Sequence, residues 1–130
     1  MKIVLAVALG SALGGILRYL ISTWVDSKLD HPLPWGTVMV NVIGCLLIGL
    51  AAELTNAHGK WAMEAYWRSF LLLGILGGFT TFSSFSHQTL ELFHLGEFLH
   101  ASLNVILSVC LCLFSVYLGH LLGNHLNRII

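Results

Sequence analysis

The sequence predicts an all-α integral membrane protein with four transmembrane helices. Of its 130 residues, 57% are hydrophobic and only 9% are charged, whereas an ordinary soluble domain is about 25% charged. The apolar residues form four runs of roughly 20 residues or more, each long enough to cross a hydrocarbon core about 30 Å thick. The connections between the runs are short, as in an antiparallel helix bundle. We therefore expect a single domain over residues 1–130.

The expected spans cover residues 3–25, 35–57, 69–93 and 99–122. The first run is longer than the hydrophobic region of a signal peptide and has no small-residue cleavage site after it, so we interpret it as a retained helix. Pro32 and Pro34 end the polar loop before the second span, and Trp35 suits the membrane interface. A polar tail, residues 123–128, follows the fourth span. An even number of spans places both termini on one side.

The third span contains the stretch GILGGFTTFSSF, residues 74–85. Glycine weakens a helix by about 1 kcal/mol relative to alanine, and serine and threonine offer the backbone competing hydrogen bonds. We therefore expect this helix to lose its winding halfway across the membrane. Unpaired backbone groups are tolerated there only when protein or a water-filled cavity satisfies them, and small-ion transporters bind ions at such breaks. The stretch predicts an ion site made of backbone groups and hydroxyls.

Small residues recur four positions apart, a spacing that lets membrane helices approach closely. The pairs are Gly10 with Gly14, Ser11 with Gly15, Gly74 with Gly78, and Gly119 with Gly123. They predict tight packing within the bundle and between copies. Because four thin helices do not easily enclose an aqueous path, we expect an oligomer, most simply a dimer.

Two polar residues in the first two spans each allow two interpretations. Arg18 either extends its charge to the interface or forms a fixed positive charge in a vestibule that concentrates anions. Asn41, in the middle of the second span, needs hydrogen-bond partners in hydrocarbon. It forms either an interhelical bond or a pore-facing donor, and we prefer the donor because the third span is also unusually polar.

The third and fourth spans carry further candidates. Phe82 and Phe85 share a helix face, where they either pack in the core or turn their positive ring edges towards a small anion. Asn104, Ser108 and Cys112 lie on one face of the fourth span at helical spacing. This row predicts a weakly polar track, although isolated serines in membrane helices usually bond to their own helix.

Several classes of function lack the residues they require. The histidines lie mostly at loops and span ends, and no HExxH motif, carboxylate pair or Ser-His-Asp arrangement can be assembled within the membrane, so we expect no enzyme. Six scattered Lys and Arg residues cannot form a nucleic-acid-binding face. The cysteines, Cys45, Cys110 and Cys112, are odd in number and form no CxxC pair, so we interpret them as small buried hydrophobes.

Three motifs resemble those of the Fluc (CrcB) fluoride channel family: GGILRY at 14–19, WGTVMVNVIG at 35–44 and GILGGFTTFSSF at 74–85. The resemblance covers essentially the whole chain. It implies a passive, fluoride-selective channel that exports cytoplasmic fluoride across a bacterial inner membrane and so provides fluoride resistance. It also implies an antiparallel, dual-topology homodimer with two pores along the subunit interface.

The same resemblance implies roles for individual residues. A structural Na+ at the dimer centre would be held by the backbone carbonyls of Gly77 and Thr80 from each subunit. The fluoride pathway would use an arginine, an amide, two rings and a hydroxyl track, namely Arg18, Asn41, Phe82, Phe85, Ser83, Ser84, Ser108 and Cys112. The fourth-span face matches the family less closely, because Cys112 stands where a hydroxyl is frequent.

Two other functions compete with a channel. A proton-coupled exporter of the small multidrug type is also a four-span dimer, but it needs a carboxylate in the middle of a span. Glu53 and Glu91 instead lie towards span ends. A structural subunit that only packs against a partner would leave the hydroxyl-rich third span without a purpose.

Overall fold

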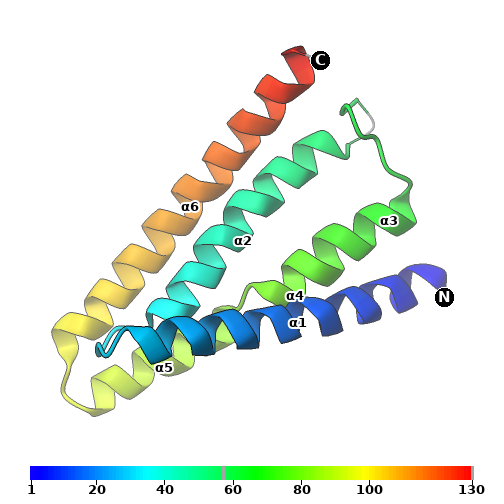
Figure 1. Cartoon of the computed structure of the whole chain (residues 1–130). Coiled ribbons are helices and arrows are strands. Elements are labelled where there is room, and N and C mark those ends of the chain that lie inside the picture. Colours follow the sequence, from blue (N-terminus) through cyan, green and yellow to red (C-terminus); the bar gives the residue numbers. More distant parts are fainter. Residues whose placement is uncertain (57, 130) are drawn as a thin grey trace.

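The computed structural model describes residues 1–56 and 58–129, and every regular element in this part of the chain is helical. Four helical segments are long and apolar enough to cross a membrane, as expected. They are α1 (Lys2–Lys28), α2 (Trp35–Leu54), an interrupted third segment, and α6 (Phe98–Ile129). The third consists of α3 (Ala65–Ser69), η1 (Phe70–Leu76), α4 (Gly77–Phe79) and α5 (Phe82–His94). The chain reverses direction from each span to the next, and both termini lie towards the same end (Figure 1).

The expected and observed spans differ mainly at their ends. Helix α1 continues to Lys28, and the third segment already begins at Ala65, within stretches that we expected to be connections. Helix α2 ends at Leu54, and the expected end at residue 57 lies outside the described residues. The largest correction concerns residues 123–128, which we expected to be a polar tail and which form the last turns of α6.

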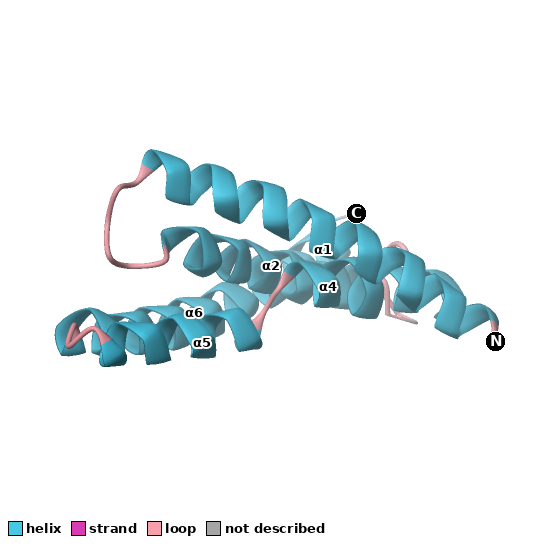
Figure 2. Cartoon of the chain, turned by 90° about the horizontal axis from the view of Figure 1, so that it is seen from below, coloured by secondary structure: helices cyan, strands magenta, loops and turns pink. Residues whose placement is uncertain are grey.

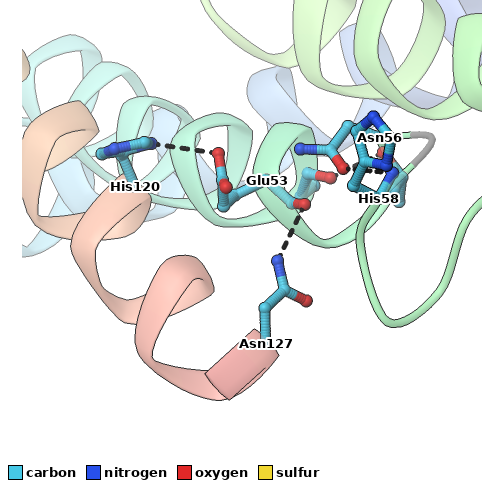
Figure 3. Close-up of polar contacts among 7 residues, drawn as sticks. Glu53, Asn56, His58, His120 and Asn127 are labelled. Atoms are coloured by element: carbon cyan, nitrogen blue, oxygen red, sulfur yellow. Dashed lines mark hydrogen bonds and ion pairs between the residues drawn. The ribbon is translucent and has the colours of Figure 1, made fainter.

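Contacts with the end of α2 explain this longer helix (Figure 3). The Asn127 side chain donates to the carbonyl of Glu53 at 3.2 Å and accepts from the backbone N–H of Lys60 at 2.8 Å. About two turns earlier, Nδ1 of His120 lies 3.2 Å from a carboxylate oxygen of Glu53. These partners hold the polar end of α6 against α2 and the following loop, so the helix continues beyond its apolar run.

Helix packing follows two seams lined by glycine. In the first, α1 lies against η1 and α4: a methyl group added at Gly10 would come within 2.8 Å of the Gly74 Cα, and one at Gly14 would collide with the carbonyl of Ile75. In the second, α2 lies against α6, where Gly49 faces the carbonyl of Val116 and Gly119 faces that of Leu46. Because these neighbours are backbone atoms, the predicted close packing within the bundle is confirmed.

The third segment is interrupted within the expected stretch 74–85, at its two threonines and not at its glycines. Gly77 and Gly78 are helical, and residues 70–76 form a π-helix that the sequence did not predict. The winding stops at Thr80 (ψ 156°) and Thr81 (φ −150°, ψ 119°), which are both extended. Gly74 and Gly78 instead allow contact with α1. Beyond the break, α5 lies alongside α6, and Figure 2 shows the short non-helical link that separates it from α4.

Candidate functional site

The side chain of Asn41 on α2 forms hydrogen bonds with the backbone of the break. Its amide nitrogen donates to the carbonyl of Thr81 at 3.0 Å, and its amide oxygen accepts from the N–H of Thr81 at 2.7 Å. Both backbone groups of an extended residue are thus satisfied inside the bundle, where an unpaired group costs about 1–3 kcal/mol. Asn41 therefore makes the interhelical bond that we considered as its alternative role. One amide hydrogen remains for another acceptor, since a carboxamide carries two N–H donors.

Thr81 also begins the second half of the span. Its hydroxyl accepts from the N–H of Ser84 at 3.2 Å, which is an N-cap on α5. The same hydroxyl donates to the Ser84 side chain at 3.1 Å and lies 3.2 Å from the hydroxyl of Ser83. The two predicted serines are therefore engaged with the cap, and Ser83 is exposed.

The two carbonyls that the family resemblance implies as Na+ ligands, those of Gly77 and Thr80, lie at or beside the same break. Among the hydrogen bonds of the described residues, none ends on the carbonyl oxygen of Gly77 or Thr80, because the N–H of Thr81 is directed to Asn41. The hydroxyl of Thr80 donates to the Leu76 carbonyl at 3.1 Å. Gly77 is exposed, and a Cβ there would meet only the Leu72 carbonyl of its own helix, at 3.5 Å.

A cavity of about 300 Å³ lies beside the break. It brings together Asn41 and Cys45 of α2, Thr80 and Thr81 of the break, Phe82 and Phe85 of α5, and Ser108 and Cys112 of α6. Five predicted pathway residues thus line one space, although they come from three helices. Ser83, Ser84 and Arg18 are not part of its lining. Within residues 1–56 and 58–129, no charged side chain lines the cavity.

The two phenylalanines occupy different positions around this cavity. Their ring centroids are 5.2 Å apart and their planes are inclined at 50°. Phe85 is 7% exposed and forms an inner wall, whereas Phe82 is 76% exposed and forms the rim. The Phe82 ring is therefore accessible to lipid or to another protein surface.

Hydrogen bonds connect α6 to α5 behind the cavity. Ser108 donates to Asn104 at 3.4 Å, Asn104 donates to Thr89 at 2.9 Å, and Thr89 donates to the Phe85 carbonyl at 2.7 Å. Asn104 is 1% exposed, so it supports the lining without reaching it, while Ser108 and Cys112 do reach it. Thr89 was not among the predicted site residues, although it lies four residues after Phe85 on the same helix face.

Two further lining residues, Cys45 and Thr81, were also missed as site residues. Cys45 follows Asn41 by one helical turn, so the spacing alone places it on the same face. Thr81 precedes Ser84 by three residues, which is the spacing of an N-cap bond. Arg18 is half-buried on α1, and no ion pair or hydrogen bond of its guanidinium is found within residues 1–56 and 58–129.

Comparison with known proteins gives consistent results over the whole chain. The family model described as CrcB-like protein, Camphor Resistance (CrcB), matches residues 5–120. The fluoride-specific ion channel FluC of Paramagnetospirillum magneticum is 50% identical over 122 residues, which is 94% of this chain and 95% of that protein. The FluC protein of Opitutus terrae is 45% identical over 129 residues, or 99% and 98% of the two chains. That of Methylocella silvestris is 44% identical over 122 residues.

Proposed function

Because the chain belongs to the CrcB family, we propose that it is a passive, fluoride-selective channel in the cell inner membrane. Fluoride that has accumulated in the cytoplasm leaves through it, down the electrochemical gradient. The observation that carries this proposal is the cavity beside the third-span break, where an amide, a hydroxyl and two aromatic rings converge without any charged group.

The lining suits a small anion that is strongly hydrated in water. To enter, fluoride must exchange its water for other donors, and conduction requires that these hold it weakly enough to release it. The second amide hydrogen of Asn41 is one such donor. The hydroxyl of Ser108 is another, because its bond to Asn104 is long, at 3.4 Å, and is easily exchanged. The edges of the Phe82 and Phe85 rings add positive partial charge without a fixed cation that would trap the ion.

A second copy of the chain completes the pathway in this proposal. In one copy, Gly77, Ser83 and the ring of Phe82 are exposed near the middle of the span, beside carbonyls without partners. Polar backbone is not tolerated against lipid hydrocarbon. An antiparallel homodimer of dual topology covers these groups and places one pore beside each copy of the break, giving two pores.

The central Na+ fits the donors that the break offers. Sodium is a hard cation that prefers oxygen, and the carbonyls of Gly77 and Thr80 from two copies supply four such ligands without any carboxylate. When bound, the ion supplies a positive field that favours anions nearby. The chain's own contribution is the pair of unbonded carbonyls, which the bond between Asn41 and Thr81 leaves free.

Fluoride efflux from liposomes tests the function. Purified protein should release fluoride at channel rates while chloride is retained, and an uncoupler that dissipates the proton gradient should leave the rate unchanged. Equal release of both halides would refute selectivity, and strict dependence on the proton gradient would favour an exporter.

A further inference from the structure

Two thiols meet in the wall of the cavity. Cys45 of α2 and Cys112 of α6 both line it, and these two helices are packed against each other. The reason is the close contact one turn further along both helices, where Gly49 lies against the carbonyl of Val116. Because the backbones nearly touch there, residues one turn earlier on the two parallel helices are brought together. The third thiol, Cys110, is exposed and is not part of this lining.

This pair has the donor set of a two-coordinate soft-metal site. Thiolate ligands select soft cations, whereas oxygen ligands select hard ones. Among the described residues there is no group of three or more His, Cys, Asp or Glu that could hold a metal ion. The pair therefore suits ions that accept two sulfurs in a line, as the d10 ions Hg²⁺, Ag⁺ and Cu⁺ do, and does not suit the tetrahedral demands of Zn²⁺.

We propose that Cys45 and Cys112 form a binding site for thiophilic d10 cations, and that an ion bound there closes the cavity to fluoride. The closing effect rests on the proposed channel function, whereas binding does not. Asn41 precedes Cys45 by one turn and Ser108 precedes Cys112 by one turn, so the bridged sulfurs lie directly beside both hydrogen-bond donors. The bridge also links α2 to α6 across the wall.

Mercuric chloride is the probe, because the neutral molecule enters the membrane interior without carrying a charge into it. In the reaction, HgCl₂ and two thiols give an S–Hg–S bridge, two protons and two chloride ions. Both S–H bonds and both Hg–Cl bonds break, and no oxidant or reductant is needed.

The first experiment measures fluoride efflux from liposomes against mercuric chloride concentration, with each protein normalised to its own uninhibited flux. Wild type and the control Cys110→Ser should be blocked alike. Cys45→Ser and Cys112→Ser should each require on the order of a hundredfold more mercury, because one thiol loses the intramolecular second bond. Equal sensitivity of either variant and wild type would overturn the proposal.

The second experiment reads binding without fluoride. Intact mass of Cys110→Ser should increase by one mercury less two protons per chain, and both remaining thiols should be protected from maleimide. Absence of this adduct would overturn the proposed binding site, even if Cys45→Ser and Cys112→Ser failed to fold. The adduct with unchanged flux would overturn only the closing effect. A wild-type protein that carries no fluoride would refute the channel function while the mass result still decided the site.

Discussion

At the scale of single residues, the bidentate contact between Asn41 and Thr81 connects fold and function. It satisfies the backbone of the break and leaves one amide hydrogen for another acceptor, on a side chain that lines the cavity. The same side chain thereby stabilises the protein and offers a donor to an anion. Substitutions that separate these two roles are therefore the most informative.

Replacement of Asn41 by alanine should lower the stability of the folded protein by about 2–4 kcal/mol, because two buried backbone groups of Thr81 lose their partners. Thermal unfolding in detergent, followed by circular dichroism, measures this change. Asn41→Asp keeps the acceptor for the Thr81 N–H but loses the donor to the Thr81 carbonyl and adds a negative charge at the cavity, so it should reduce both stability and fluoride flux. Unchanged melting of Asn41→Ala would contradict the structural role.

The two rings allow a matched comparison. Phe82→Ile and Phe85→Ile should both reduce fluoride flux severalfold, because isoleucine has no ring edge for an anion. Only the Phe85 variant should also lower the melting temperature of the single chain, since within one copy that ring is 7% exposed whereas Phe82 is 76% exposed. Liposome efflux and thermal unfolding separate the two effects. Full flux in both variants would remove the rings from the mechanism.

At the scale of elements, the two halves of the interrupted third segment pack against different helices. Residues 70–79 lie against α1 along a glycine seam, whereas α5 lies against α6. The extended pair Thr80 and Thr81 permits this change of neighbour. The break therefore places the two halves of one span against different helices, and the cavity lies where they separate.

Gly14→Ala should destabilise the protein by about 1–3 kcal/mol, because the new methyl group collides with backbone atoms of Ile75 and Phe79 that cannot rotate away. Gly15→Ala is the matched control: its nearest neighbour is an Arg18 side-chain nitrogen at 3.9 Å. Alanine there should be neutral or stabilising, since it favours helix. Equal melting temperatures for the two variants would contradict the seam.

At the scale of the whole molecule, one copy leaves polar groups at mid-span without cover. Gly77 illustrates the point, because it is exposed and helical and has room for a methyl group within its own chain. If lipid covers this position, alanine should be tolerated. If a second copy packs against Gly77, the added methyl group should weaken the association of the two copies.

Gly77→Ala should therefore retain the helical content and melting of the single chain while the dimer fraction falls at least severalfold. Chemical cross-linking in detergent measures the dimer fraction, and circular dichroism measures the helical content and melting. A variant that dimerises as well as the wild type would place the interface, and the proposed Na+ site, elsewhere.

The sequence by itself determined the four membrane spans, the interruption of the third and five residues of the cavity lining. Composition, run length and one-turn spacing are local properties, and the lipid environment makes them decisive because every backbone group must be satisfied. The resemblance of the three motifs supplied the family.

Only the tertiary structure decided which residues break the helix, what Asn41 binds, and that Cys45 meets Cys112. Each of these depends on which helices are in contact. Gly74 and Gly78, which would weaken an isolated helix, stay helical where the backbone of α1 lies against them. The amide of Asn41 on α2 satisfies the backbone of Thr81, which is not helical. Contacts between distant segments are absent from local sequence patterns, so side-chain partners could not be read from spacing alone.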